Sequence, residues 1–555
     1  METRNCQNCK IDFDIEEEDF SFYEKMKVPA PFSCPDCRFK MRAVWRNEIS
    51  LYSGQKCGLC NKSIVSMYNP NGKYLIYCNT CYRGDGWDFK SYAMDYDFDK
   101  TFFEQLNELI LKVPKNALLS VSGAGQNLNS EFTNSVGGLK NCFFCFNCAW
   151  VDDSQYCRGV TSSKEIFDSY FCDKLDCCYE NVNTQQCSSV THAQNAVSCI
   201  NSHFILNVSG LTNCFGCVNI RNKSNCFFNE QLTPEEYKSK VKEIFGSYKK
   251  MIEFNEEFKK LCLNVPHRAT HNVKALDSIG DYLSECKNLK YSFEIVDGEN
   301  SKWVFSSRKV KDSYGTIGYA IKSEQLLEVV STGASSHVIG SWACDLSSNL
   351  EYCASCFPSN SDLVGCDSMK NSQYCILNKQ YSKEEYEKVR NHIISELISK
   401  NQYGLMLPPG LCPFAYNETV AQDNMPLSEE QAVSEGFKWE DNIQTTKGKE
   451  TMQPEEIPDH IKDIPGHITS EVLKCVSCER NYKINDQELL FYRKMNLPIP
   501  RKCFYCRHKD RIVLRGPYQF WKRNCDLCKN EIMTNFSPDR KEIIYCESCY
   551  QKEVY

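Results

Sequence analysis

Two sets of Cys-x2-Cys pairs, one near each end of the chain, constrain the fold more than any other feature of the sequence. The interval between the first two pairs, from Cys9 to Cys34, equals that from Cys478 to Cys503, and the interval between the last two pairs also matches in both sets. The sequence between the pairs repeats too, because Phe22-Tyr23 recurs as Phe491-Tyr492. One unit with four cysteine pairs is therefore present twice.

This spacing predicts four structural zinc sites, two in each unit. Two Cys-x2-Cys turns direct four thiolates toward one point and complete a closed tetrahedral site, which leaves no open position for a substrate. Disulfide bonding is the alternative. However, residues 1–12 lack the apolar stretch of a secretory signal, so we expect a reducing, cytoplasmic environment in which cysteine more often binds metal. The predicted zinc ligands are Cys6, Cys9, Cys34, Cys37, Cys57, Cys60, Cys78, Cys81, Cys475, Cys478, Cys503, Cys506, Cys525, Cys528, Cys546 and Cys549.

The two sites of a unit are expected to differ in structure. Pro35, directly after Cys34, predicts the first turn of a helix that runs to Trp45 and places a ligand pair at the helix N-terminus, a treble-clef-like arrangement. In the second site, residues 63–68 and 73–77 alternate like strands on either side of a turn, which predicts a hairpin in a zinc ribbon.

These motifs resemble those of a known family. Cys6-x2-Cys9, Phe22-Tyr23, Pro31 and the run from Cys34 to Arg38 resemble a zinc-ribbon module found in many uncharacterised bacterial proteins. The whole chain is similar to long cysteine-rich bacterial proteins with such modules at both ends. The second copy departs from the pattern, with Phe504-Tyr505 where the first has Pro-Asp. The resemblance implies zinc binding and no established activity.

The middle of the chain is also duplicated, as the recurrence of Val113-Pro114 as Val265-Pro266 indicates. Within each copy, short strand-like segments with polar corners recur at a spacing of about 20 residues, as the positions of Cys157, Cys178 and Cys199 illustrate. The pattern predicts a fold that is mainly β with some α: a tandem-duplicated parallel β-solenoid or β-helix, flanked by small zinc modules at both termini.

The cysteines of the middle are interpreted as core residues. Cys214 of the first copy aligns with Leu363 of the second, and Cys353 aligns with Phe204. A metal ligand does not tolerate such replacement, whereas a buried thiol used as a small apolar group does. Additional metal is the alternative, with Cys142, Cys145 and Cys148 as the best candidates.

Helices are expected around each solenoid copy, shielding its ends. Residues 102–111 and 254–263 have helical apolar spacing, and Thr233 and Ser382 have the character of N-caps. Residues 401–473 are rich in proline and acid and predict an extended connector, with one short helix from Ser428 to Glu435. The predicted organisation is a double zinc module (1–90), a helix with the first solenoid copy (91–250), a helix with the second copy (251–400), the connector (401–473) and a second double zinc module (474–555).

The charge distribution suggests how the ends and the middle differ in function. In residues 474–555 the Lys and Arg clearly outnumber the Asp and Glu, although the whole chain has a net charge of -7. Basic side chains interleaved with aromatic ones are typical of nucleic-acid binding. The first hypothesis is therefore a non-enzymatic zinc protein whose terminal modules bind nucleic acid or a ribonucleoprotein, with the solenoid as a rigid spacer. The candidate contacts are Arg501, Lys502, Arg507, Lys509, Arg511, Arg515, Lys522, Arg523 and Trp521.

Two other function classes stay open. One is a protein–protein interaction scaffold that uses the acidic surface of the solenoid. The other is an enzyme, a hydrolase or lyase acting on polysaccharide or nucleic acid, but the histidines are scattered and no catalytic motif is present. A nuclease on the treble clef would need a histidine beside the zinc site, and Phe39 stands where the second copy has His508. We therefore predict no catalytic residues. No apolar run is long enough for a membrane span.

Overall fold

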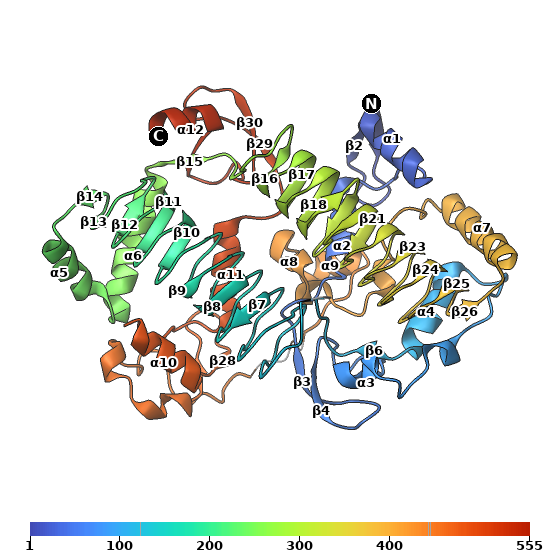
Figure 1. Ribbon diagram of the computed structural model, residues 1–555, viewed down its shortest axis with the longest axis horizontal. Helices are drawn as coiled ribbons and strands as arrows, with labels where there is room; N and C mark the ends of the chain where they lie inside the picture. Colours follow the sequence, from blue (N-terminus) through green and yellow to red (C-terminus); the bar gives the residue numbers. More distant parts are fainter. Residues whose placement is uncertain (122–123, 442, 444–445, 555) are drawn as a thin grey trace.

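The computed structural model describes residues 1–121, 124–441, 443 and 446–554. It is mainly β with some helices (Figure 1). The cysteine clusters lie in the segments near the two termini. Two large sheets of mostly parallel strands form the body of the molecule. Within the described residues, no helix combines the length and the apolar character that crossing a bilayer requires.

The first large sheet, called here the first stack, follows the chain from strand to strand. Each strand from β7 to β13 pairs in parallel with the next at a nearly constant offset along the sequence, as in Thr191 with His203 and His203 with Phe215. The last strand turns back antiparallel. The strands are β7 (Ala149–Asp152), β8 (Thr161–Phe167), β9 (Asp176–Tyr179), β10 (Thr191–Val197), β11 (His203–Ser209), β12 (Phe215–Val218), β13 (Cys226–Phe227) and β14 (Glu230–Gln231).

The second stack repeats this arrangement. Its offset is the same as that of the first, apart from an irregular start and single-residue insertions that make Tyr314 pair with Leu327 and Ser348 with Ser361. Strands β18, β19, β21 and β20 close a ring of parallel pairings. The strands are β16 (Ile279–Ser284), β17 (Lys287–Val296), β18 (Glu299–Arg308), β19 (Val310–Lys311), β20 (Tyr314–Ile317), β21 (Ser323–Val330), β22 (Ser336–Ile339), β23 (Ser348–Glu351), β24 (Ser361–Val364), β25 (Gln373–Ile376) and β26 (Lys379–Gln380).

A rhythm of three underlies both stacks. Asn141, Phe144 and Asn147 have φ of 54°, 50° and 58°, and the residue after each is a fully or almost fully buried cysteine. Every third residue thus turns the chain in the left-handed region, and the next side chain points inward. The expected repeat of about 20 residues is therefore wrong. The cysteines that suggested it, such as Cys157 and Cys178, are separated by a multiple of three residues, so both side chains point inward. Their separation is not a multiple of the offset between paired strands, so they do not lie at equivalent positions of neighbouring strands.

The inward-pointing cysteines fill apolar cores. Cys142, for example, lies 3.4 Å from the carbonyl oxygen of Lys140 and 3.2 Å from that of Val151, close enough for its thiol to donate. The other interior cysteines make similar contacts and pack with Val, Leu and Ile. Such a thiol fills a small apolar space while satisfying a carbonyl, which favours core residues over metal ligands. The buried cysteines of the two cores are Cys142, Cys145, Cys148, Cys157, Cys172, Cys178, Cys187, Cys199, Cys214, Cys217, Cys226, Cys286, Cys344, Cys353, Cys356, Cys366 and Cys375.

The predicted helices are present, and each packs against one of the two stacks. Phe102 packs against Tyr352 of the second stack with ring centroids 5.9 Å apart, although its helix precedes the first stack in sequence. Phe254, whose helix precedes the second stack, packs against Phe215 of the first at 4.5 Å. The four helices are α4 (Phe102–Lys112), α5 (Pro234–Ile244), α6 (Tyr248–Leu263) and α7 (Lys383–Ser399).

The two terminal units share one order of elements. The first comprises β1 (Glu2–Asn5), β2 (Asp12–Ile15), α1 (Glu17–Met26), α2 (Pro35–Ala43), β3 (Tyr52–Lys56), β4 (Ser63–Ser66), β5 (Ile76–Tyr77), α3 (Asn79–Arg83) and the 3-10 helix η1 (Phe89–Tyr92). The second comprises β27 (Leu473–Lys474), β28 (Asn481–Tyr482), α10 (Asp486–Lys494), α11 (Phe504–Arg515), β29 (Trp521–Asn524), β30 (Glu531–Thr534), β31 (Ile543–Tyr545) and α12 (Glu547–Val554).

The predicted hairpin between residues 63–68 and 73–77 is wrong. Strand β4 pairs instead with β3, on the other side of the Cys57–Cys60 turn, and β5 pairs in parallel with β6 (Lys115–Asn116). The Cys57–Cys60 turn is thus the loop of a hairpin formed by β3 and β4. Strand β5 takes no part in that hairpin and pairs with β6, outside the unit. The second unit does the same, because β31 pairs with β15 (Pro266–Arg268).

Residues 401–473 are more than an extended connector. Leu407, Phe414 and Tyr416 are buried in the largest apolar core. The Trp45 indole donates to the Leu407 carbonyl oxygen at 3.1 Å, which ties the segment to the first unit. The predicted short helix is present. The helical elements of this segment are η2 (Pro409–Leu411), η3 (Tyr416–Glu418), α8 (Val420–Asn424), α9 (Glu429–Ser434), η4 (Ile461–Asp463) and η5 (Gly466–Thr469).

Candidate metal centres and the arginine network that joins them to the stacks

The predicted ligands come together as four separate tetrads. In each tetrad the four sulfur atoms lie within 4.8 Å of one another, and none of the chain's cysteines forms a disulfide. The tetrads are Cys6, Cys9, Cys34 and Cys37; Cys57, Cys60, Cys78 and Cys81; Cys475, Cys478, Cys503 and Cys506; and Cys525, Cys528, Cys546 and Cys549.

The same local geometry builds all four tetrads. The residue after the second cysteine is left-handed in each turn, at Lys10, Asn61, Glu479 and Lys529. A backbone N–H from the other pair donates to the first sulfur, at 3.2 Å from Cys34 to Cys6 and at 3.3 Å from Cys78 to Cys57, and the second unit repeats both bonds. The turn therefore folds its amides around sulfur, which favours thiolate.

Helix starts add to this preference. Cys34, Cys78 and Cys503 are the N-caps of α2, α3 and α11, where the helix dipole favours negative charge. Hydrogen bonding with Cys37 lowers the pKa of the Cys34 thiol to about 5, and bonding with Cys503 lowers the pKa of Cys475 to about 4. Each of these two sites therefore holds a thiolate at neutral pH.

The tetrads fit a tetrahedral all-sulfur metal site. Four sulfurs at about 2.3 Å from a central ion lie ~3.8 Å from one another. The observed separations are 3.6 Å for Cys9 to Cys34, 3.9 Å for Cys60 to Cys78, 3.6 Å for Cys478 to Cys503 and 3.8 Å for Cys528 to Cys546. Four thiolate donors of this kind can hold a soft or borderline metal ion without any change of backbone.

A cluster of carboxylates near the first tetrad is occupied by an amine. Glu16, Glu18 and Asp19 lie close enough to bind a cation. The Lys302 ammonium lies 2.7 Å from Glu16 and 2.9 Å from Asp19, so a side chain of the second stack already supplies the positive charge. This cluster joins the first unit to the second stack.

The helix that follows the first tetrad is fastened to the second stack by arginines. Arg38 donates to the Glu328 carboxylate at 2.9 Å, and Arg42 donates to its other oxygen. All three side chains are buried, and beside them Phe22 stacks on Tyr314 with ring centroids 3.8 Å apart. The first unit is thus bound to the stack that is farther away in sequence.

The second unit makes the corresponding contacts with the first stack. Arg511 donates to one Asp168 oxygen at 2.9 Å, and Arg507 lies 3.2 Å from the other. Asp168 is fully buried, and Phe491 stacks on Phe167 at 4.0 Å. The N-terminal unit therefore packs against the second stack and the C-terminal unit against the first (Figure 1).

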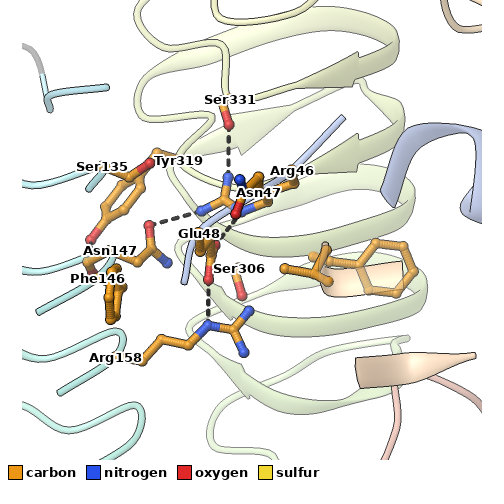
Figure 2. Close-up of polar contacts among 12 residues, drawn as sticks. Arg46, Asn47, Glu48, Ser135, Phe146, Asn147, Arg158, Ser306, Tyr319 and Ser331 are labelled. Atoms are coloured by element: carbon orange, nitrogen blue, oxygen red, sulfur yellow. Dashed lines mark hydrogen bonds and ion pairs between the residues drawn. The ribbon is translucent and has the colours of Figure 1, made fainter. Parts of the chain in front are cut away.

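A buried carboxylate joins three parts of the chain at the centre of the molecule. Glu48 of the first unit accepts from both Arg46 and Arg158, the latter from the first stack (Figure 2). Arg46 also donates to Ser331 of the second stack at 2.9 Å and to Asn147 of the first at 2.8 Å. Although burial opposes ionisation, the two arginines lower the pKa of Glu48, so it stays charged between them.

The candidate nucleic-acid contacts fall into two groups. Arg507, Arg511 and Arg515 are buried and face groups of this chain, and Arg501 donates to the carbonyl oxygens of Ile457 and Pro458, each at 2.9 Å. They present no surface to phosphate. The candidates that remain fully or partly exposed are Lys502, Lys509, Lys522, Arg523 and Trp521.

The sequence carried a signal for the buried role of the arginines. Arg38, Arg42 and Arg46 recur at every fourth position, and so do their counterparts Arg507, Arg511 and Arg515. In α11 that spacing places three guanidinium groups on one helix face, whereas α2 ends at Ala43, before Arg46. His508 is also buried, 3.6 Å from the Asp423 carboxylate and stacked on Phe504. The carboxylates that receive these groups lie far away in sequence and carry no motif.

Comparisons with known proteins add little. No protein-family model matches the chain, and no curated protein matches it. Among solved structures, a protein described as a "putative acetyltransferase" from Desulfovibrio desulfuricans G20 aligns at 9% identity and a TM-score of 0.11, covering 48% of this chain and 78% of its own. A TM-score this low carries no argument about fold or activity.

Proposed function

We propose that this chain is a non-enzymatic, zinc-dependent scaffold for protein partners, in which the terminal modules hold two β-solenoids in a fixed arrangement. The observation that supports it is that two buried arginine clusters join each terminal unit to the stack farther from it in sequence. Arg38 and Arg42 contact Glu328, and Arg507 and Arg511 contact Asp168. Because the arginines of these helices bind carboxylates of the stacks, the modules hold the stacks in place. The exposed surfaces of the stacks are then available to bind partner proteins.

Chemical reasoning supports zinc, the solenoids and the cytoplasmic location. Zinc is proposed because closed sites with four thiolates and this sulfur spacing suit Zn²⁺. Solenoids are proposed because a constant offset between paired strands lets one chain wind through successive parallel rungs. The cytoplasm is proposed because so many cysteines without a disulfide require a reducing compartment.

Metal analysis tests the zinc assignment directly. We expect elemental analysis of the purified protein to give about four zinc ions per chain, one for each tetrad. Replacing Cys57 and Cys60 by serine should reduce the content by one, whereas replacing the interior Cys157 and Cys178 should leave it unchanged. A content clearly above four, falling with the interior pair, would show that the stack cysteines bind metal.

Affinity purification from native cells tests the scaffold. We expect a defined set of proteins to accompany the chain, to survive nuclease treatment, and to be lost when Glu328→Gln and Asp168→Asn release both modules. The matched control is Glu299→Gln, whose carboxylate makes an exposed pair with Lys311 at 3.3 Å. Recovery of proteins only together with intact RNA or DNA would argue against a protein scaffold.

Nucleic-acid binding is the second candidate, supported by the exposure of Lys509 and Lys522 in the basic C-terminal module. Fluorescence anisotropy with RNA and DNA across a salt series should then give a steep negative slope of affinity against salt. Reversing both lysines to glutamate should flatten that slope, while Lys274→Glu, in an exposed pair with Glu285, should not. An unchanged slope in the double variant would exclude this surface.

A further inference from the structure

A cavity of about 480 Å³ lies where the first unit meets both stacks. Arg46 and Arg83 line it from the first unit, Trp150 from the first stack, and Tyr319, Lys322 and Lys370 from the second. Figure 2 shows the Arg46 side of the lining, with Ser135 and Tyr319 beside the guanidinium. The volume is in the range of pockets that take small-molecule ligands.

The lining itself holds more cationic than anionic side chains. Arg46 is balanced by Glu48, but among the described residues none of Arg83, Lys322 and Lys370 forms a salt bridge. Lys370 directs its ammonium at the carbonyl oxygens of Tyr82 and Arg83, at 3.3 and 3.5 Å. Among the described lining residues, Asp345 is the one carboxylate, and it accepts from the Gly333 amide at 2.6 Å. An anion would complete this set of charges.

Lys322 extends the positive charge outward. It also lines an adjoining hollow of about 350 Å³ together with Lys309 and Lys311; Glu324 is the acid of that lining, and Glu299 pairs with Lys311 at 3.3 Å. A row of lysines at the mouth of a cavity raises the local concentration of anions and guides them inward. The cavity therefore has both a cationic lining and a cationic approach.

The rest of the wall is aromatic and apolar. The Trp150 side chain is 57% exposed, which is unusual for an indole that lies between two stacks, and Leu346 beside the cavity is 46% exposed. Phe357 also lines the cavity, and the Arg83 guanidinium lies 5.5 Å from its ring centroid. Flat aromatic faces in reach of guanidinium and ammonium groups suit a planar ring that carries phosphate.

We propose that this cavity binds a nucleotide. Its phosphate groups pair with Arg83, Lys322 and Lys370, and its base packs against Trp150 and Phe357. The ligand would bridge the first unit and both stacks, so its binding would also strengthen their association. This assignment does not depend on the scaffold proposal, because the cavity exists whatever the outer surfaces bind.

Isothermal titration of the zinc-loaded full chain with ATP, GTP, adenosine and inorganic phosphate tests the proposal. We expect a nucleotide to bind more tightly than adenosine or phosphate. In the Lys322→Gln/Lys370→Gln variant, nucleotide affinity should fall at least about tenfold, because charge-assisted hydrogen bonds to phosphate are lost, while adenosine binding persists. In Trp150→Ala, nucleotide and adenosine should both weaken while phosphate does not.

Lys274→Gln is the control, since this exposed lysine is paired with Glu285 away from the lining. Its affinity should equal that of the unmodified protein. Equal melting temperatures for all variants would show that each remains folded. The proposal is overturned if no nucleotide binds at millimolar concentration, or if the double lysine variant binds nucleotide as tightly as the original chain.

Discussion

At the scale of single residues, Glu328 and Asp168 each join a terminal unit to a stack. Each is fully buried, and each receives two guanidinium groups from a helix that begins at a cysteine tetrad. Removing charges from water is costly, and the geometry must repay that cost through hydrogen bonds. Removing the Glu328 charge therefore leaves Arg38 and Arg42 without the carboxylate that they share, whereas Arg507 and Arg511 also lie 3.5 Å from Glu488 and 3.4 Å from Glu180.

Glu328→Gln should consequently destabilise the protein strongly. With Arg38 and Arg42 still buried, we expect a loss of about 3–5 kcal/mol in the free energy of unfolding, measured by denaturant titration with circular dichroism. The control Glu299→Gln removes an exposed partner and should change it by less than about 1 kcal/mol. Equal effects of the two substitutions would show that the buried cluster adds no stability.

At the scale of elements, the stacks depend on left-handed corners. Several asparagines occupy these corners with a φ in the left-handed region, among them Asn195, Asn201 and Asn213. The side-chain amide of each donates to the asparagine at the equivalent corner next to the following strand. Asparagine tolerates this conformation and bonds along the stack, whereas a β-branched residue does not. The corners, rather than strand propensity, set the path of the chain.

Asn213 offers a matched pair of substitutions. Asn213→Gly loses the amide ladder but accepts the left-handed backbone, so we expect a cost of about 1 kcal/mol or less. Asn213→Val loses the ladder and also strains the backbone, which should add about 1–2 kcal/mol. Thermal unfolding compares the two, and a valine variant as stable as the glycine variant would contradict the importance of the corner.

At the scale of the whole molecule, the crossed units make distant parts of the sequence interdependent. The N-terminal unit grips the second stack, the C-terminal unit grips the first, and β5 and β31 each add a strand from the segment before a stack. The helices α6 and α7 pack on the stacks that they directly follow, as Phe254 on Phe215 and Tyr386 on Tyr374 show, but the terminal units pack on the stacks farther from them in sequence. Cutting the chain should therefore leave the pieces associated.

A protease site introduced next to Gly448, which is exposed, tests this expectation. After cleavage, the C-terminal fragment should co-elute with the rest in size-exclusion chromatography, because its contacts with Asp168 and Phe167 are intact. Chelation of metal should then release it, since small modules of this kind fold only around their ion. Separation of the nicked fragments without a chelator would disprove the crossed clamp.

Much of the candidate site could be predicted from sequence, because it depends on short spacings. Which cysteines meet is fixed by tight Cys-x2-Cys turns, and the helix starts at Pro35 and Pro234 follow from local capping rules. The rhythm of three was also readable, since Cys142, Cys145 and Cys148 stand at every third position. The spacing of about 20 residues between Cys157, Cys178 and Cys199 hides it, because that spacing spans several of these three-residue steps.

The long-range partners, by contrast, depend on the folded structure. The sequence determined the four tetrads, the duplication and the helices, because each arises from neighbouring residues. It did not determine that Arg38 meets a carboxylate 290 positions away, or that a cationic cavity opens between three distant segments. Nothing in the sequence around Glu328 distinguishes it from an exposed acid. It is buried by the packing of the stack against the first unit, and burial is a property of the whole fold.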